Sequence, residues 1–388
     1  MGRKVFFVLA VILGLGVVTG TNIDNGKAVA ATHSRKVCAT SPPAGTARCH
    51  AIILTDSGGV EPMAATTPQG YGPAAFKAAY GVRSTTTSHI GIVVAYDAPD
   101  ITSDQTTFSK AFGLPPLPAC TSATQNGCFE KLNQRGGKTY PATNSSWAVE
   151  TSLDVESAHG MCPGCRITLV EANTASMSNL SAAVDTAVAS GAKVVSNSYG
   201  GAESTGEAAY DSHYHKAGIT MVVSSGDGGY GTDYPAASPY VVAVGGTTLK
   251  VSDTRVVSET AWDGAGSGCS QFEPKPTWQT DKKCVRRSVA DIAADADPST
   301  GAAIYDSYPT TGHSGWFTVG GTSLAAPLVA GTIAASGTTG NQPAYLYSKA
   351  ASVIRDITTG SNGSCATYFC KATAGYDGPT GLGVLDHL

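Results

Sequence analysis

The sequence carries little charge, since only 14% of its 388 residues are Asp, Glu, Lys or Arg and the formal net charge is −4. It has no basic block of the kind that follows a phosphate backbone, so nucleic acid is not expected as a partner. It also lacks a long apolar run, because the early run at residues 5–18 is shorter than the roughly 20 residues of a membrane span. No later stretch approaches that length. These absences argue against a nucleic-acid-binding module and against a membrane protein.

The first residues predict export. Arg3 and Lys4 precede the apolar run, and Ala-Val-Ala at residues 28–30 offers small residues for a signal peptidase. Residues 1–30 are therefore expected to be a signal peptide, with a short membrane anchor as the alternative. The predicted location is secreted and extracellular, without membrane association.

The ten cysteines fit an exported chain, because an even number of cysteines in that setting indicates disulfides. They fall into pairs that are close in sequence: Cys38 with Cys49, Cys120 with Cys128, Cys162 with Cys165, Cys269 with Cys284, and Cys365 with Cys370. The Cys162-Pro-Gly-Cys165 motif leaves a redox or zinc site open as an alternative, although no second such motif or paired histidine completes a zinc site.

Residues 31–70 are rich in Thr, Ala, Pro and Gly with little periodicity, which predicts an irregular N-terminal segment. From residue 71 onward, short apolar runs typical of buried parallel strands recur. They lie at residues 90–95, 166–170, 194–196, 220–223 and 241–244. Helical patterns separate them at residues 147–159, 179–190 and 206–217. This alternation predicts an α/β fold for residues 71–388, with a mainly parallel central sheet flanked by helices on both faces.

Ser323 lies in the stretch Val-Gly-Gly-Thr-Ser-Leu-Ala-Ala-Pro, where a glycine pair precedes the start of a predicted helix. A serine at a helix start is usually a cap. The alternative is a nucleophile, because glycine allows close backbone approach and a helix N-terminus favours developing negative charge. A nucleophilic serine needs a base to activate it.

Two candidates for that base precede the serine. His159 is followed by glycine, but Pro163 would break a helix that began at this histidine. Glu150 and Asp154 are four residues apart on a predicted helix, so both carboxyl groups lie on one face. A solvated acidic face is the alternative, yet the neighbouring residues are largely apolar and a like-charged pair at this spacing is destabilising unless a proton is shared.

Six separated blocks carry a resemblance to a known family. They are Glu150 with Asp154, Ser196-Asn-Ser-Tyr-Gly200, Ser225-Gly-Asp227, residues 234–247, residues 291–298, and Gly321-Thr-Ser323 with Pro327. In this order they resemble the sedolisin (serine-carboxyl) peptidases, over a stretch from about residue 71 to the C-terminus.

The resemblance implies a subtilisin-like α/β fold and endopeptidase hydrolysis through an acyl-enzyme on Ser323. It implies that Glu150 is the general base, that Asp154 orients Glu150, and that Asp227 donates a hydrogen bond to the oxyanion. Ser198, Tyr199 and Gly200 are implied as the edge along which the backbone of a protein or peptide substrate pairs as an added strand.

The implied role of Asp227 has a chemical condition. A carboxyl group stabilises an oxyanion only while it holds its proton, and an ionised one about 4 Å away would cost about 4 kcal/mol at an effective dielectric constant of about 20, or about a thousandfold in rate. Glu150 must instead be able to accept a proton. Both conditions hold together only in acid unless burial raises both pKa values, so an acidic pH optimum is expected.

The C-terminal region resembles the calcium loop of the same family. Asp356, Ile357, Thr373, Gly375 and Asp377 would surround one structural Ca²⁺ ion with carboxylate and main-chain oxygens, a donor set that suits this hard cation. An ordinary Asp-Gly-rich surface turn is the alternative. Thr373 departs from the family pattern, in which glycine is usual, but it would supply only a carbonyl.

Two other functions remain open at this point. One is a non-catalytic secreted binding protein on the same fold, although all four catalytic positions are filled. The other is a subtilisin-type peptidase that uses His159 as its base. A monomer is expected, and the short stretch of about 40 residues between signal and domain puts control by a long folded prosegment in doubt.

Overall fold

The computed structural model describes residues 33–83, 86–340, 342–365 and 367–388. The predicted signal peptide lies outside these residues. Within them, no helix combines the length and the apolar character that crossing a membrane would require.

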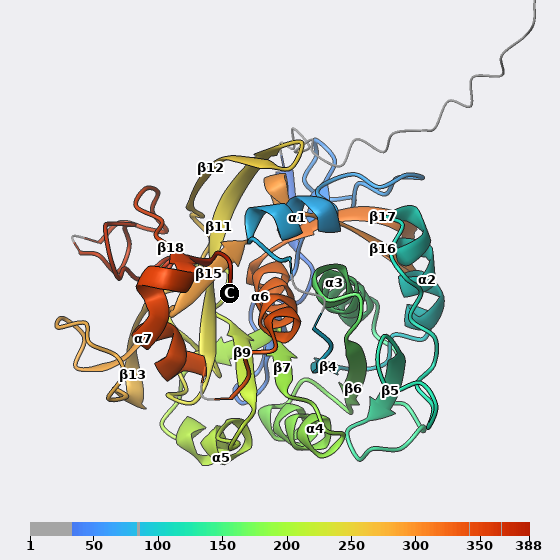
Figure 1. Ribbon diagram of the computed structural model, residues 1–388, viewed down its shortest axis with the longest axis horizontal. Coiled ribbons are helices and arrows are strands. Elements are labelled where there is room, and N and C mark those ends of the chain that lie inside the picture. The colour runs from blue at the N-terminus through green and yellow to red at the C-terminus, as the bar shows by residue number, and fades with distance from the viewer. Residues whose placement is uncertain (1–32, 84–85, 341, 366) are drawn as a thin grey trace, which may run out of the picture.

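A ten-stranded sheet forms the centre of the molecule (Figure 1). In order across the sheet, its strands are β18 (Ile354–Arg355), β19 (Val384–Leu385), β15 (Ile292–Asp295), β11 (Val242–Ser252), β9 (Thr220–Ser224), β7 (Val194–Asn197), β4 (His89–Ala95), β6 (Arg166–Ala172) and β5 (Phe129–Asn133), with β12 (Arg255–Ala261) paired to β11. The pairs from β19 through β5 are parallel, whereas β18 and β12 pair antiparallel. The predicted α/β class with a mainly parallel sheet is confirmed.

Helices cover both faces of this sheet. On one face α3 (Ser145–Met161) and α6 (Thr322–Ser336) lie side by side, and on the other lie α4 (Met177–Ala189) and α5 (Asp211–Tyr214) (Figure 1). The remaining helices are α1 (Pro73–Ala79), α2 (Ile101–Ala111), α7 (Gln342–Val353) and the short 3₁₀ turns η1 (Glu207–Tyr210) and η2 (Pro298–Thr300).

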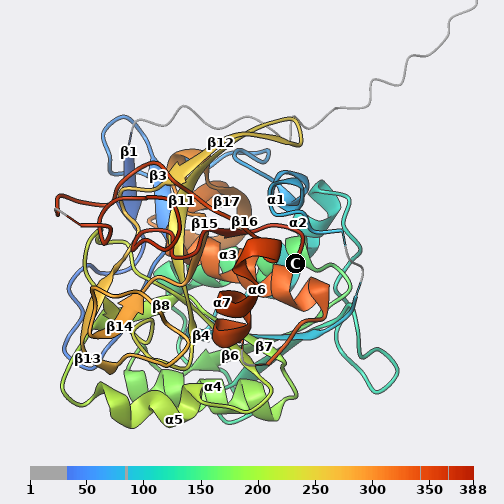
Figure 2. The ribbon, with the colours of Figure 1, turned by 60° about the vertical axis from the view of Figure 1, so that its left-hand side comes forward.

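Three smaller sheets complete the fold. The first has four strands, β1 (His33–Lys36), β3 (Ile52–Thr55), β17 (His313–Gly320) and β16 (Ala302–Thr310), and Figure 2 shows β1 beside β3. The second consists of β10 (Asp233–Tyr234), β8 (Tyr199–Ala202) and β2 (Arg48–Cys49), and the third of β13 (Gly268–Pro274) and β14 (Arg286–Val289). The first two include strands from the N-terminal segment.

Helices α3 and α6 pack closely against each other, which requires small residues where they touch. The side-chain oxygen of Asn144 caps α3 by accepting hydrogen bonds from the N–H groups of Ser146 and Trp147. A Cβ at Gly331 of α6 would lie 2.6 Å from the Cβ of Met161, so glycine permits this close approach. The two helices therefore pack tightly against each other and hold polar residues in a fixed relation.

All five disulfides form between the cysteines paired in the sequence analysis. Their sequence separations run from 3 to 15 residues, so each closes a short local loop. The disulfide between Cys162 and Cys165 removes the alternative of a zinc site at this motif.

Two sequence-based expectations differ from the structure. The helix expected at residues 206–217 is shorter in the structure, where only η1 and the four-residue α5 form. The chain leaves the helical conformation after α5, and Gly218 then adopts φ 74°. The N-terminal segment expected to be irregular contains β1, β2 and β3. Their partners β8 and β17 lie far along the chain, and local periodicity does not reveal such pairing.

Candidate active site

Ser323 is the second residue of α6 and is fully buried. The residue before the helix, Gly321, adopts φ 90°, a conformation that favours glycine. The Ser323 hydroxyl donates a hydrogen bond to the backbone oxygen of Ser198 at 3.2 Å. The serine is thus held at a helix N-terminus, where the backbone N–H groups favour a developing negative charge.

Glu150 and Asp154 lie one turn apart on α3, and both are fully buried. Burial is the main cause that raises the pKa of each carboxyl group well above its usual value, and the neighbouring Asp154 adds to the effect on Glu150. The Ser198 hydroxyl donates to Oδ1 of Asp154 at 2.6 Å. Two carboxyl groups in one buried site disfavour each other's ionisation, so the pair does not readily carry two negative charges.

The surroundings of the Glu150 carboxyl group suit a role in proton transfer. Within the described ranges, neither of its oxygens has a hydrogen-bond partner. The Ser323 hydroxyl and the N–H of Ala51 lie near enough to lower the pKa of Glu150 somewhat, although neither makes an ordinary hydrogen bond to it. A buried carboxyl group beside a hydroxyl, with no fixed partner, can accept the proton of that hydroxyl.

Asp227 follows β9 and lies on the other side of the α6 N-terminus. Its Oδ1 accepts hydrogen bonds from both the N–H of Thr322 at 2.8 Å and the Thr322 hydroxyl at 2.9 Å. Its Oδ2 lies 2.9 Å from the point where a Cβ on Gly321 would stand, and so faces the space beside Ser323. Burial raises the pKa of Asp227, which favours a protonated Oδ2 able to donate.

These pKa directions change the basis of the expected acidic optimum. Ordinary carboxyl pKa values require an acidic optimum, unless burial raises the pKa values of both groups. Burial does raise the pKa values of Glu150 and Asp227. Asp227 therefore keeps its proton up to a higher pH than an exposed carboxyl group would.

The predicted substrate edge, Ser198 to Gly200, leads into β8 on the rim of this site. Ser198 and Tyr199 are buried, and Arg48 and Cys49 of β2 pair antiparallel with Gly200 and Tyr199. A short strand of the same chain therefore already occupies this edge.

The sequence reasoning missed three residues that shape the site. Thr322 binds Asp227, and its position inside the Gly-Thr-Ser motif was a usable signal. The imidazole of His50 lies in a buried pocket, with Nδ1 2.7 Å from the Ser224 hydroxyl and Nε2 3.3 Å from Oδ2 of Asp233. No local pattern marks His50 or Asp233, because they are 183 positions apart in the numbering and meet only in the folded chain.

His159 lies near the end of α3 rather than at a helix start. Its Nε2 is 3.1 Å from the backbone oxygen of Pro115, and burial lowers its pKa to about 4. The ring is thus engaged away from Ser323, which leaves the carboxyl pair as the candidate base.

The five predicted calcium ligands gather in one C-terminal region. Oδ2 of Asp356 accepts from the N–H of Gly375 at 2.7 Å, and Oδ2 of Asp377 accepts from the N–H of Thr373 at 2.9 Å. Ile357 is buried next to Asp356. Among the described residues, no cluster of three or more acidic, His or Cys side chains surrounds a common centre.

The chemistry of this donor set nevertheless fits a cation. Burial, with a smaller effect of the nearby Asp356 carboxyl group, raises the pKa of Asp377 to about 7. Two acids close together in a partly buried loop are stabilised by a bound positive charge. With only two carboxylates, main-chain oxygens would have to supply the other ligands.

The block at residues 291–298 supports the sheet rather than the chemistry. Asp291 and Arg287 form a fully buried ion pair at 2.5 Å, and Asp291 also accepts from the N–H of Ala243 on β11. Oδ1 of Asp295 accepts from the N–H of Leu249 at 3.1 Å. Both aspartates thus satisfy backbone groups between neighbouring strands.

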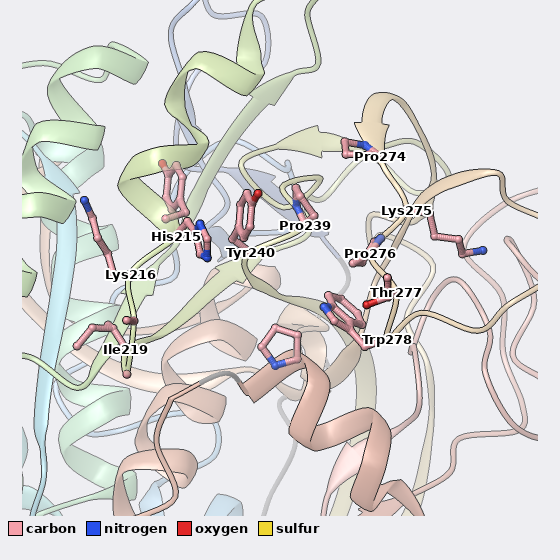
Figure 3. A pocket seen from close by; sticks show the side chains of 14 residues that line it. His215, Lys216, Ile219, Pro239, Tyr240, Pro274, Lys275, Pro276, Thr277 and Trp278 are labelled. Carbon is pink, nitrogen blue, oxygen red and sulfur yellow. The ribbon is translucent and has the colours of Figure 1, made fainter.

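A cavity of about 430 Å³ lies away from these residues (Figure 3). Its walls include His215, whose ring stacks on that of Tyr240 with centroids 4.1 Å apart, and Trp278. None of the predicted catalytic residues lines it. Cavity size therefore does not identify the catalytic centre in this fold.

The sequence profile of the subtilase family matches residues 139–355, more than half of the chain. Sedolisin from Pseudomonas sp. (strain 101) is 30% identical over 389 residues, an alignment that covers 87% of this chain and 64% of the relative. Kumamolisin from Bacillus sp. (strain MN-32) is 33% identical over 274 residues, covering 60% of this chain and 48% of the relative. The chain thus spans about half to two thirds of the length of these curated relatives.

The solved structures include a similar fold. Pseudomonas sedolisin, a serine-carboxyl proteinase complexed with two molecules of pseudo-iodotyrostatin, superposes with a TM-score of 0.69 at 28% identity. The match covers 82% of this chain and 96% of that one.

Proposed function

Because this chain belongs to the subtilase family, within its sedolisin group, we propose that it is a serine-carboxyl endopeptidase that hydrolyses protein or peptide substrates. The observation that carries the proposal is the meeting of α3, the loop after β9 and the start of α6. These three elements bring Glu150, Asp154, Asp227 and Ser323 to one buried site. The residues are spread over 174 positions in the numbering, so their meeting is a property of the fold.

The reaction follows from the positions of the protons. Ser323 Oγ attacks the carbonyl carbon of the scissile bond while Glu150 takes its proton, and Asp154 shares its own proton with Glu150. The carbonyl oxygen becomes an oxyanion that accepts hydrogen bonds from the N–H of Ser323 and from protonated Asp227. Glu150 then protonates the leaving amine, and a water molecule hydrolyses the ester by the same steps in reverse.

A non-catalytic binding protein on the same fold is the weaker alternative, because all four catalytic positions are filled and converge. A peptide-library digest over a range of pH, with Ser323→Ala as the control, tests the proposal. We expect cleavage by the wild type and none by the variant. Equal cleavage by both chains would show that another residue, or a contaminant, is responsible.

The role of Asp227 predicts a specific pH dependence. Hydrolysis by the wild type should fall as pH rises through the raised pKa of Asp227, because the ionised group loses its donor and repels the oxyanion. In Asp227→Asn the amide donates at every pH, so this variant should keep a larger fraction of its own maximal rate at high pH. The measurement is kcat/KM against pH for both chains.

Thr322→Val provides the matched control for that profile, since it removes a hydroxyl donor to Asp227 without changing the acid itself. Loss of that donor should raise the pKa of Asp227 and move the fall to higher pH. Superimposable profiles for the wild type and Asp227→Asn would contradict the assignment of the proton to Asp227.

One structural Ca²⁺ ion is part of the proposal. Asp356 and Asp377 would bind it together with main-chain oxygens of Ile357, Thr373 and Gly375, and the ion would tie the C-terminal loops to the sheet. A chelator should lower the melting temperature by about 5 °C, the shift expected when binding worth about 3 kcal/mol is removed. The shift should be absent in Asp377→Asn and present in Asp253→Asn, which changes an exposed turn. An unchanged melting temperature in the wild type would reject the ion.

The five disulfides support export into an oxidising compartment. We propose that the protein is secreted and acts outside the cell. A monomer suffices for this chemistry, because one chain supplies all four catalytic residues.

A further inference from the structure

A glycine-rich loop at residues 225–231 carries Asp227 and is here called the Asp227 loop. Just before the aspartate, the backbone oxygen of Gly226 accepts from the N–H of Gly266 at 2.7 Å. That donor belongs to residues 264–267, here called the clamp segment. The backbone on the amino side of Asp227 is therefore fixed by a segment from elsewhere in the sequence.

The same clamp segment fixes the carboxyl side of the Asp227 loop. The N–H of Gly229 donates to the backbone oxygen of Gly264 at 2.9 Å, and the N–H of Gly231 donates to the backbone oxygen of Ser267 at 2.7 Å. Because both sides of the aspartate are bound to one segment, a shift of the clamp segment moves the carboxyl group of Asp227.

The buried side chain of Asn362 holds the clamp segment. Its Nδ2 donates to the backbone oxygen of Ala265 at 2.5 Å and to the hydroxyl oxygen of Ser267 at 2.7 Å. The Ser267 hydroxyl donates its own proton to the backbone oxygen of Phe369 at 2.6 Å, so it acts toward Asn362 as an acceptor. Both partners of Nδ2 thus require a donor.

An amide group suits these two acceptors, because it carries two N–H donors on one nitrogen. An ionised carboxylate of the same shape only accepts, and a hydroxyl group donates once. Asn362 is 2% exposed, so a substitution that removes the amide leaves two buried oxygen atoms without this donor.

The backbone of Asn362 also contacts the Asp227 loop directly. Its oxygen accepts from the N–H of Tyr230 at 3.0 Å. The same oxygen is 2.6 Å from the point where a Cβ on Gly229 would stand, and Gly229 adopts φ 70°. Glycine at this position therefore permits the close approach of the two segments.

A short antiparallel contact and a disulfide fix Asn362 itself. The N–H of Asn362 donates to the backbone oxygen of Cys370 at 3.1 Å, and Ser361 bridges Lys371. Cys370 is joined to Cys365, five positions before it. This C-terminal region thus forms a support from which the amide of Asn362 reaches the clamp segment.

The support bears on the chemical step. A protonated Asp227 stabilises the oxyanion only if its Oδ2 lies within hydrogen-bond reach of that oxygen. Thr322 binds Oδ1 and orients the carboxyl group, whereas the clamp segment sets the place of the backbone that carries it. A misplacement of about 1 Å in such a group costs about a hundredfold in rate.

We propose that Asn362 is a positioning residue of the peptidase: its amide group holds the clamp segment, and through it the Asp227 loop, where the oxyanion is stabilised. This rests on the proposed function. Because Asn362 is buried, it acts through Asp227 and not through a contact with the substrate. Its loss therefore slows the chemical step and leaves substrate binding nearly unchanged.

Steady-state kinetics of Asn362→Ala on a peptide that the wild type cleaves test the proposal. We expect kcat to fall about tenfold to a hundredfold, somewhat less than the loss caused by removing an oxyanion donor outright, and KM to change by less than about twofold. The matched control is Asn133→Ala. Asn133 anchors a turn after β5 by accepting from the N–H of Gly137 and donating to the backbone oxygen of Thr139, and its variant should keep the wild-type kcat.

A double variant separates positioning from a general loss of stability. In Asp227→Ala the oxyanion donor is already gone, so adding Asn362→Ala should lower kcat by no more than about a further twofold. A merely structural role would lower kcat by the same factor in both backgrounds. Melting temperatures establish that each chain is folded during the assay. Ser267→Ala, which removes one of the two acceptors, is the milder variant to use if Asn362→Ala does not fold, and a smaller fall in kcat is expected.

The disulfide provides an independent variant. Replacing Cys365 and Cys370 by serine should loosen the support of Asn362 and lower kcat, with KM nearly unchanged. The matched control replaces Cys120 and Cys128, which close a separate loop, and should leave kcat at the wild-type value. An equal kcat in the two double variants would contradict a support that depends on the disulfide.

Two further results would overturn the proposal and leave the peptidase standing. One is a kcat of the Asn362→Ala and Ser267→Ala chains equal to that of Asn133→Ala. The other is an equal effect of Asn362→Ala with and without the Asp227 carboxyl group. A wild type that cleaves no peptide would instead reject the proposed function, and this proposal with it.

Discussion

Replacing Glu150 by Gln should reduce peptide hydrolysis by about ten-thousandfold or more, the loss seen when one member of a catalytic unit is removed. The amide has nearly the same shape but cannot take the proton of the Ser323 hydroxyl. Glu150 is fully buried, so its side chain is shielded from bulk solvent. The measurement is kcat/KM on one peptide found in the library digest.

Three further variants serve as controls for this experiment. Ser323→Ala should lose activity to a similar degree, and the double variant should be no worse than either single one, because the two groups act as a unit. His159→Gln should keep most of the activity, since His159 contacts Pro115 instead of the serine. Activity retained in Glu150→Gln and lost in His159→Gln would replace the carboxyl pair by a histidine base.

The melting temperature should fall as pH rises from about 6.5 to about 9, on the order of 10 °C in total. One source is an acid cluster formed by Asp104 of α2, Glu156 of α3 and Asp306 of β16, all at most 2% exposed. Within it, Asp104 loses most of its contribution before this pH range begins, so Glu156 and Asp306 carry the effect. Burial raises the pKa of Asp306 to about 8, that of Asp104 to about 6, and that of Glu156 well above its usual value. Each is therefore protonated in the fold at pH values where it is ionised in the unfolded chain.

The sign follows from proton linkage. A carboxyl group with a raised pKa stabilises the fold fully below its unfolded pKa of about 4, and this contribution is lost as pH rises through the folded value. His89 and His159 act in the opposite sense, because burial lowers the pKa of each to about 4. They matter only below about pH 6.5, where the unfolded chain begins to protonate them. Above that pH these two histidines no longer contribute to the slope.

Asp306→Asn tests the source of this slope. The amide oxygen can still accept from the N–H of Tyr308, as Oδ1 of Asp306 does at 3.0 Å, but the side chain no longer ionises. The variant should lose less stability than the wild type between pH 6.5 and 9, and Asp253→Asn, in an exposed turn, should match the wild type. Calorimetric scans at fixed calcium concentration measure this. A melting temperature that rises over this range would contradict the raised pKa values.

Several features of the protein could be predicted from the sequence because they depend on neighbours along the chain. The disulfides join cysteines at most 15 positions apart, so pairing the nearest partners was sufficient. The apolar runs of the parallel strands reflect burial on both faces of the sheet. Glu150 and Asp154 share a helix face because four residues complete about one turn. These signals are local, and periodicity captures them.

The roles of individual polar residues were beyond such reasoning. Thr322 binds Asp227 across 95 positions, and Asp233 binds both Arg48 and His50 across more than 180. The raised pKa values follow from burial, which no short stretch of sequence determines. The acidic optimum stays a prediction, and burial raises the pKa values of both Glu150 and Asp227.

By itself, then, the sequence determined which elements form and which chemical groups are available: a buried parallel sheet, five short disulfide loops, a serine at a helix start and two acids on one helix face. Only the tertiary structure decided that α3, the loop after β9 and the start of α6 converge on one site, and that β2 pairs with β8 at its rim. The physical reason is that strand pairing and burial depend on partners distant in sequence. An extended segment such as Arg48–Cys49 has no stable structure until β8 supplies its hydrogen bonds.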